Sequence, residues 1–283
     1  SRYISTKLGQ TCCRYSVSLA TMERLQASQA PEDLQALLTL LASAAEFEEF
    51  RPKQGEKGPL REMSKKSIRW PLKGAIDTAA KKVNVLVQIA LSDPPRPKLN
   101  WDLQMQHMQV LRRLEFIANL SIELYESGQQ GKQLALALML RKCIRKRIWE
   151  NSTAQIRQLP QIGDVLAEKL MAAGMGSLQG LLQADPRHIE LVCSRKLPFG
   201  NDLQEKVRAV PRATLQVTST GTNALLVAVS WTGRSGNDGA EQQPARAGFA
   251  HLVVYSLPGG CLVQHSRLAD TKPLQLQIQM PAG

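Results

Sequence analysis

The first three quarters of the chain carry apolar residues at helical spacing. Residues 31–50 begin with Pro, Glu and Asp, which is typical of a helix N-terminus, and their leucines recur every three or four positions. Residues 75–91, 100–126 and 132–149 follow the same period, whereas prolines and glycines break residues 51–74. We therefore expect four long helices, and a loop with one short helical turn over 51–74.

The period changes near Pro211. Residues 153–208 predict further helices in short pieces, but from Thr214 onward apolar and polar residues alternate, with glycine-rich breaks at 233–248 and 258–260. About five strands fit this pattern, fewer than the roughly seven of an immunoglobulin-type sandwich. The expected fold class is multidomain and mainly α, with a C-terminal all-β domain that is incomplete, as in a truncated chain or an isoform.

Composition excludes several classes of protein. The chain has 283 residues, enough for two or three domains, and no run of eighteen apolar residues, so we expect no membrane span. The first thirty residues lack a signal-peptide pattern. Five cysteines, an odd number with no Cys-x-x-Cys pair, argue against a disulfide scaffold and against a zinc site, and they favour a reducing compartment.

The chain is strongly basic, with a formal net charge of +12. Residues 1–150 carry +9 of it; within them, residues 51–98 contribute +8 and the run 141–147 contributes +5, offset by acidic stretches. Such clusters favour an electropositive surface that meets a polyanion, most often nucleic acid. Ordinary solvated helix and loop faces are the alternative, and a nuclear-import signal is a third interpretation of 141–147.

One motif points to a way of binding phosphate. Residues 159–170 (LPQIGDVLAEKL) predict a tight turn at Ile162–Gly163, followed by a helix that turns Ala167 and Leu170 inward. This spacing resembles the helix-hairpin-helix family of DNA-binding modules. A hairpin glycine lets the backbone N–H groups of a helix N-terminus approach a phosphate without a side chain in the way.

The motif departs from the family pattern at two positions. Gln161 stands where the family usually has its first glycine, and Asp164 adds a negative charge where the phosphate would bind. Lys169 would assist phosphate binding if the turn contacts DNA. The alternative is a small helical packing unit that bridges two domains.

Several stretches together resemble one family and cover nearly the whole chain. They are LGQTCCRYSVSLATM at 8–22, AAEFEEFRPKQGEKGPLREM at 44–63, IRWPLK at 68–73 and RHIELVCSRKLPFGNDL at 187–203, of which the last is the most specific. With the motif at 159–170, they resemble the meiotic, Mer-type branch of the Ski-type superfamily-two DExH helicases, and within it the C-terminal module without the motor. Related modules occur in spliceosomal and Ski-type RNA helicases.

The resemblance implies a division into domains. Residues 1–22 would be the end of a winged-helix or linker segment, 23–150 a helical ratchet bundle, 151–210 a helix-hairpin-helix domain and 211–283 an immunoglobulin-like β-sandwich. In the family, a long helix of the bundle touches the translocating single strand, and residues 100–126 are the best candidate for that helix.

The candidate nucleic-acid contacts follow from this family role, from the basic run and from the hairpin motif. On the long helix, polar side chains would form the contacting face, with Met105 or Met108 as apolar neighbours of the bases. Arginine suits such a surface because it pairs with phosphate and also stacks on bases. The full set is Gln106, Gln109, Arg112, Arg113, Arg141, Lys142, Arg145, Lys146, Ile162, Gly163 and Lys169.

No catalytic, cofactor-binding or metal-binding residue is predicted. A helicase motor needs the phosphate-binding pattern Gly-x-x-x-x-Gly-Lys-Ser/Thr. The nearest match, GQQGKQ at 128–133, lacks the first glycine at the required spacing and has Gln133 in place of the hydroxyl. ATP and Mg²⁺ would therefore bind in motor domains of the parent protein, and any enzymatic activity would belong to that parent.

The leading hypothesis is a DNA-gripping accessory module of an ATP-dependent DNA helicase that acts in meiotic homologous recombination and crossover formation in the nucleus. Its expected partner is single-stranded or branched DNA, with recombination proteins as further candidates. Neither a membrane nor a small-molecule substrate is expected. The alternatives are a protein-interaction scaffold of the same helicase class and the equivalent module of an RNA helicase.

Overall fold

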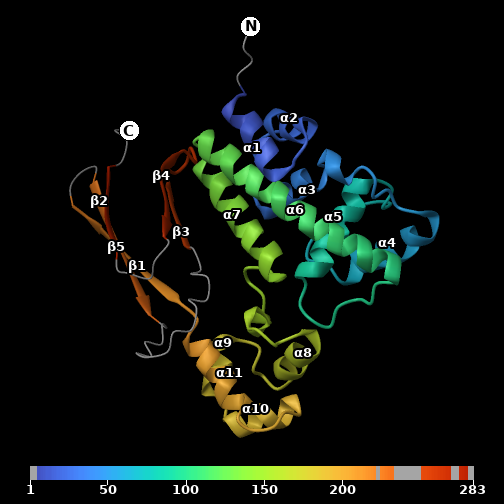
Figure 1. Cartoon of the computed structure of the whole chain (residues 1–283), viewed down its shortest axis with the longest axis vertical. Helices are drawn as coiled ribbons and strands as arrows, with labels where there is room; N and C mark the ends of the chain where they lie inside the picture. Colours follow the sequence, from blue (N-terminus) through green and yellow to red (C-terminus); the bar gives the residue numbers. More distant parts are fainter. Residues whose placement is uncertain (1–4, 221–223, 233–249, 269–273, 280–283) are drawn as a thin grey trace. The chain divides into compact units, whose positions relative to one another are not determined.

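The computed structural model describes residues 5–220, 224–232, 250–268 and 274–279 (Figure 1). Two compact units divide the chain, unit 1 over Ser1–Ser152 and unit 2 over Thr153–Gly283. Most of the described residues are helical, and an antiparallel β region lies at the C-terminal end of the sequence. This confirms the coarse fold class expected from the sequence. The glycine-rich break predicted at 233–248 lies outside the described residues.

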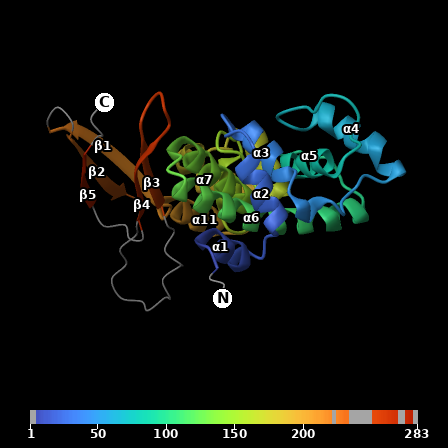
Figure 2. The same cartoon turned by 90° about the horizontal axis from the view of Figure 1, so that it is seen from above.

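Unit 1 is a helical bundle built around α5 (Ala79–Leu91). Its other elements are α1 (Lys7–Tyr15), α2 (Leu19–Ala27), α3 (Leu34–Ala42), η1 (Ala45–Phe47), η2 (Gln54–Glu56), α4 (Lys57–Lys66), α6 (Trp101–Ser127) and α7 (Gly131–Lys146). Every residue from Lys82 to Leu91 is buried, because α3, α4, α6 and α7 all pack against α5. In both views α4 lies on the opposite side of the bundle from α7 (Figures 1 and 2).

Three of the four long predicted helices are present as α5, α6 and α7, with shifted ends. The helix expected over 31–50 is shorter, since α3 ends at Ala42 and only the η1 turn follows it. The Asn100 side chain caps α6 by accepting a hydrogen bond from the Leu103 N–H at 2.9 Å. Helix α5 begins four residues later than predicted because Thr78 caps it, with its hydroxyl oxygen 3.3 Å from the Lys81 nitrogen. Helix α7 ends at Lys146 rather than at 149, since Arg147 adopts a left-handed conformation with a φ of 52°.

The prediction of a single short turn over 51–74 is wrong. Residues 57–66 form the ten-residue helix α4, preceded by the η2 turn. Pro59 lies in the first turn of α4, where its missing N–H has no intrahelical partner to lose, so the proline starts this helix rather than breaking it. Leu60 and Ser64 face inward, one turn apart, and hold α4 against the bundle.

Polar side chains on α5 position the segment around α4. Lys82 is 1% exposed and its Nζ lies 2.5 Å from Oε2 of Glu56, which is itself 6% exposed. The Gln88 side chain accepts from the Trp70 N–H at 2.8 Å and donates to the Trp70 carbonyl oxygen at 3.1 Å. The core of the bundle therefore fixes both the start of α4 and the loop that follows it.

In unit 2, residues 153–210 form short helices around one apolar core. The elements are η3 (Gln155–Gln158), α8 (Asp164–Ala172), α9 (Leu178–Gln183), α10 (Pro186–Cys193) and α11 (Phe199–Arg208). Ala167 and Leu170 of α8 are buried in this core, as predicted. The chain turns at Gly174, which has a φ of 78°, and Ser177 caps α9 by accepting a 2.9 Å hydrogen bond from the Gly180 N–H.

Helices α10 and α11 meet closely at Gly200. A Cβ atom at this position would lie 2.2 Å from the carbonyl oxygen of Pro186, so a larger residue would push the helices apart. The Gly200 N–H also donates to the buried carboxylate of Glu190 at 3.0 Å. The stretch 187–203, which carries the most specific part of the family resemblance, therefore contains a packing contact that only glycine allows.

The described β region has five strands in two antiparallel sheets. One sheet has the order β1–β2–β5, from β1 (Arg212–Ser219), β2 (Ala224–Thr232) and β5 (Leu274–Gln279); the other pairs β3 (Ala250–Tyr255) with β4 (Leu262–Leu268). Val227, Val229 and Ile278 are buried, and apolar side chains of β3 and β4 pack against them. The two sheets thus share a small core.

Candidate nucleic-acid interface

The longest helix of unit 1 exposes an apolar stripe. Trp101, Met105, Met108 and Phe116 of α6 are 74%, 45%, 47% and 43% exposed, and exposed Arg112 stands among them. Because these positions recur every three or four residues, the five side chains share one face of a helix that is ~40 Å long. We call them the α6 stripe. Large apolar side chains gathered on a surface indicate a binding site.

Polar groups accompany the stripe at Gln109 and Arg112. Both side chains are exposed, and within the described part of the chain no ion pair engages Arg112. A guanidinium in this position is free to pair with phosphate or to lie flat on a base. Trp101 and Phe116 were absent from the predicted contacts, although their spacing relative to Met105 and Met108 was a readable signal.

Arg113, predicted to share the contacting face, is instead half-buried against a neighbouring segment. It donates to the carbonyl oxygen of Glu46 at 2.8 Å and forms an ion pair with the Glu49 carboxylate. Its guanidinium carbon also lies 5.2 Å from the centroid of the Phe50 ring. These contacts tie α6 to the segment after α3, so Arg113 points away from the stripe.

Gln106 lies on the same flank as Arg113, because seven residues make nearly two full turns. Its side chain is half-buried and donates to Oε1 of Glu56 at 3.4 Å. Of the four polar residues predicted on α6, the structure therefore places Gln109 and Arg112 toward solvent near the stripe, and Gln106 and Arg113 against neighbouring elements.

The basic run on α7 divides in the same way. Arg141 donates to Oδ1 of Asn119 at 3.2 Å, and Nε of Arg145 lies 2.9 Å from the Glu115 carboxylate, so both arginines bridge α7 to α6. The other two predicted contacts, Lys142 and Lys146, are exposed. Part of the charge in this run thus holds two helices together, and part faces solvent.

Arg147, at the end of α7, reaches the stripe from the neighbouring helix. Its guanidinium nitrogen lies 3.6 Å from the sulfur of Met108. Burial, and secondarily the charge of Arg147, lower the pKa of adjacent His107 to about 4, so this imidazole is neutral at pH 7. The sequence could not show that Arg147 lies here, because its place depends on the left-handed turn that ends α7.

The hairpin motif keeps an open backbone. Gln161 adopts a left-handed conformation with a φ of 74°, and Gly163 caps the start of α8. No atom lies within 4 Å of a Cβ built at Gly163, so the backbone there is accessible. Ile162 is buried in the core, and only its main chain could meet a phosphate.

The negative charge of Asp164 in this motif is balanced from within unit 2. Oδ1 of Asp164 lies 3.0 Å from Nε of Arg157, whose side chain is buried. Lys169 is exposed, one turn after Val165 on the outer face of α8. The acidic residue therefore counts less against an anion at the hairpin than its position in the sequence indicated.

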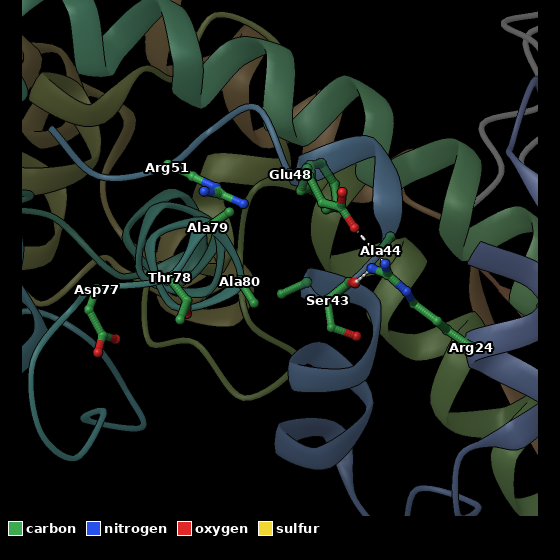
Figure 3. A pocket seen from close by; sticks show the side chains of 11 residues that line it. Arg24, Ser43, Ala44, Glu48, Arg51, Asp77, Thr78, Ala79 and Ala80 are labelled. Atoms are coloured by element: carbon green, nitrogen blue, oxygen red, sulfur yellow. Dashed lines mark hydrogen bonds and ion pairs between the residues drawn. The ribbon is translucent and has the colours of Figure 1, made fainter. Parts of the chain in front are cut away.

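A cavity of about 520 Å³ opens between the end of α3 and the start of α5 (Figure 3). Arg24 lines it, but its guanidinium is 2.5 Å from the Glu48 carboxylate and 2.8 Å from the Ser43 carbonyl oxygen. Arg51 reaches toward the space above Ala79. Because Arg24 and Glu48 neutralise each other, the cavity is a weaker candidate for a charged ligand than the α6 stripe.

Two further properties concern the described residues alone. They contain no group of three or more His, Cys, Asp or Glu side chains arranged to hold a metal ion. None of their helices combines the length and the apolar character that a bilayer span requires.

Known proteins are similar to this chain over most of its length. The model of the Sec63 Brl domain family matches residues 5–276. The probable ATP-dependent DNA helicase HFM1 of Homo sapiens is 30% identical over 218 residues, which cover 75% of this chain and 15% of that protein. The ATP-dependent DNA helicase MER3 homolog of Oryza sativa subsp. japonica is 24% identical over 289 residues, covering 96% of this chain and 24% of that protein.

An RNA helicase is also similar. The DExH-box ATP-dependent RNA helicase DExH14 of Arabidopsis thaliana is 24% identical over 216 residues, covering 75% of this chain and 10% of that protein. The chain spans a quarter or less of the length of each of these three relatives. The chain belongs to the Sec63 Brl domain family and, over most of its length, is homologous to the HFM1 and MER3 DNA helicases.

Proposed function

We propose that this chain is a DNA-gripping accessory module of an ATP-dependent DNA helicase, and that the α6 stripe contacts an unpaired strand. The exposed row of Trp101, Met105, Met108, Arg112 and Phe116 carries the proposal. The names of the HFM1 and MER3 relatives support DNA as the partner. Meiotic recombination as the process and the nucleus as the compartment belong to the same proposal.

The stripe suits single-stranded DNA because unpaired bases offer their faces to aromatic rings. Trp101 and Phe116 would stack on bases at the two ends of the stripe, and Arg112 would pair with phosphate or stack between them. Methionine side chains between the rings adapt to any base, since a thioether is flexible and polarizable. Such a surface grips without reading sequence, which a translocating helicase requires.

The hairpin in unit 2 would add a second contact. We propose that residues 151–210 form a helix-hairpin-helix domain and residues 211–283 an immunoglobulin-like sandwich. The open backbone at Gly163, with exposed Lys169 on the same helix, supports a sequence-independent phosphate contact at the start of α8. The two small antiparallel sheets with one shared core support the sandwich. ATP and Mg²⁺ would be bound by motor domains outside this chain.

Fluorescence anisotropy with a labelled single-stranded oligonucleotide tests the role of the stripe. We expect Trp101→Ala to weaken binding of the full chain about 5- to 100-fold, as for the loss of one stacked base. Arg112→Ala should weaken it and lower the slope of log affinity against log salt by about 1. The control is Lys7→Ala, which removes an exposed charge from α1 and should leave the affinity unchanged.

Two results would count against the proposal. Undetectable binding of the unaltered chain to single-stranded DNA at ~50 mM salt would favour the scaffold alternative, because phosphate contacts are strongest at low salt. Equal affinity of the unaltered chain, Trp101→Ala and Arg112→Ala would move the contact away from α6.

The similarity to an RNA helicase favours one second candidate, a module that grips RNA. Competition between DNA and RNA strands of the same sequence distinguishes the two, since only a contact or clash with the 2′-hydroxyl separates them. A preference for RNA of tenfold or more would replace DNA as the proposed partner.

A further inference from the structure

Helix α4 lines up three basic side chains on one exposed flank. Lys57, Arg61 and Lys65 are all exposed and stand four residues apart, while Leu60 and Ser64 face the bundle. A helix rises 1.5 Å per residue, so successive members of the row are about 6 Å apart along the axis. We call the three residues the α4 ridge. In both views the ridge helix lies across unit 1 from α7, so this charge is distinct from the run at 141–147 (Figures 1 and 2).

Nearby cations are paired, but those of the ridge are not. Lys66 lies 2.7 Å from the Glu62 carboxylate and Lys81 lies 2.8 Å from the Asp77 carboxylate. Among the described residues, no acidic side chain comes within ion-pair distance of Lys57, Arg61 or Lys65. An unpaired row of like charges destabilises the isolated helix, because like charges four residues apart repel.

The acidic residue near Lys57 is Asp77, and its carboxylate already pairs with Lys81. The pKa of Asp77 is lowered chiefly by the hydrogen bond from Lys81, and the charge of Lys57 adds a smaller, longer-range effect. The nearby carboxylate is therefore held by another lysine, and the charge of the ridge remains available to an external anion.

The α4 ridge differs from the α6 stripe in the apolar side chains that accompany the basic residues. Large exposed apolar residues occur on α6 but none of those described lies on α4. Protein interfaces depend on apolar and aromatic anchors at their centre. Binding to a phosphate backbone needs only cations, and an aromatic group matters only where bases are unpaired. The composition of the ridge therefore favours a nucleic-acid backbone over a protein partner.

We propose that the α4 ridge binds the phosphate backbone of duplex nucleic acid. This goes beyond the proposed role of the stripe and stands without it, because a duplex hides its bases from the aromatic residues of α6. The segment that leads into α4 meets the start of α6: Nζ of Lys53 lies 3.8 Å from Asp102, and Gln106 donates to Glu56. The two helices therefore approach each other at their N-terminal ends, which suits a junction where a duplex meets an unpaired strand.

The test compares a blunt duplex with a single strand of the same length, using the full chain. The ridge variant is Lys57→Gln/Arg61→Gln/Lys65→Gln, since glutamine preserves helix propensity. The control variant is Lys66→Gln/Lys81→Gln/Lys132→Gln, which removes the same number of charges from lysines that already have carboxylate partners. Circular dichroism would verify that both variants keep their helices.

We expect the ridge variant to bind the duplex at least tenfold more weakly at ~50 mM salt, and its salt slope to fall by about 2 to 3, one per lost phosphate contact. The control variant should lose less than threefold. Both the ridge variant and Trp101→Ala should bind a junction substrate more weakly than the unaltered chain does. The ridge variant should keep its affinity for the single strand, and Trp101→Ala should keep its affinity for the duplex.

Three outcomes would overturn the inference. If the ridge variant binds the duplex as tightly as the unaltered chain, the α4 ridge is not a binding site for duplex nucleic acid. An equal loss in the control variant means that net charge, rather than the ridge, governs binding. Loss of binding to polyglutamate with unchanged duplex binding would assign the ridge to an acidic protein. The proposal for the stripe is tested by the affinity of Trp101→Ala for the single strand, and the proposal for the ridge by the affinity of the ridge variant for the duplex. Each proposal can therefore fail without affecting the test of the other.

Discussion

Replacing Lys82 by Met should destabilise unit 1 strongly, because it leaves a buried carboxylate without its cation. Lys82 and Glu56 are both almost fully buried and lie 2.5 Å apart. Glu56 keeps only the Lys53 N–H at 2.8 Å and the weaker Gln106 contact at 3.4 Å after the change. Breaking such a buried pair costs about 3–5 kcal/mol of unfolding free energy at pH 7.

The pH dependence makes the prediction sharper. Burial by itself would raise the pKa of Glu56, but the hydrogen bonds from Lys82, the Lys53 N–H and Gln106, together with the charge of Lys82, outweigh it, so the pKa is lowered. The unaltered chain therefore gains stability from Glu56 above the unfolded-state pKa and loses it as the pH falls. In Lys82→Met the hydrogen bond and the charge of Lys82 are lost while burial remains, so the folded-state pKa of Glu56 rises relative to the unaltered chain, and the penalty should shrink as the pH falls and the carboxylate takes up a proton.

Hydrogen exchange of the α5 amides measures this free energy within unit 1, whatever unit 2 does. The double variant Glu56→Gln/Lys82→Met is the matched control, since it removes both charges and should regain most of the lost stability. A loss below about 1 kcal/mol in Lys82→Met, or a double variant as unstable as the single one, would refute the reasoning.

Two further changes test other parts of the fold. Gly200→Ala should lower the stability of unit 2 by about 2 kcal/mol or more, because its Cβ would meet the Pro186 carbonyl oxygen at 2.2 Å; Gly163→Ala, with open space around it, should leave the thermal midpoint unchanged. His107→Leu should reduce the pH dependence of stability: His107 has a folded pKa of about 4, so the unaltered chain loses about 2 kcal/mol between pH 7 and pH 5 as the unfolded imidazole takes up a proton. Urea titrations at the two pH values would show this, and an equal loss in the Leu variant would contradict it.

Local patterns were sufficient where the structure depends on neighbours in sequence. The apolar period of α6 and its cap at Asn100 each depend on residues a few positions apart, so the helix and its start could be predicted from the sequence. The same holds for the inward face of α8. Alternation likewise predicted β1, β2, β3 and β5, whereas β4 (LVQHSRL) alternates only in part.

What escaped prediction depends on contacts between distant segments. Arg112 and Arg113 are adjacent in sequence and equally basic, yet only the fold of residues 46–50 against α6 decides that Arg113 is tied down and Arg112 is not. The ridge on α4 was hidden for a different reason: glycines and a proline predicted a loop, and a loop has no periodic face on which charges align.

The left-handed turn at Gln161 has a consequence for how such hairpins are found. The backbone there has a φ of 74°, a conformation that favours glycine, and Lys206 donates a 2.8 Å hydrogen bond to the Gln161 side chain. A search that requires glycine at both hairpin positions would pass over this chain, although the backbone at Gln161 has the left-handed torsion that glycine favours. Catalogues compiled from backbone torsions rather than from residue identities would recover hairpins of this kind.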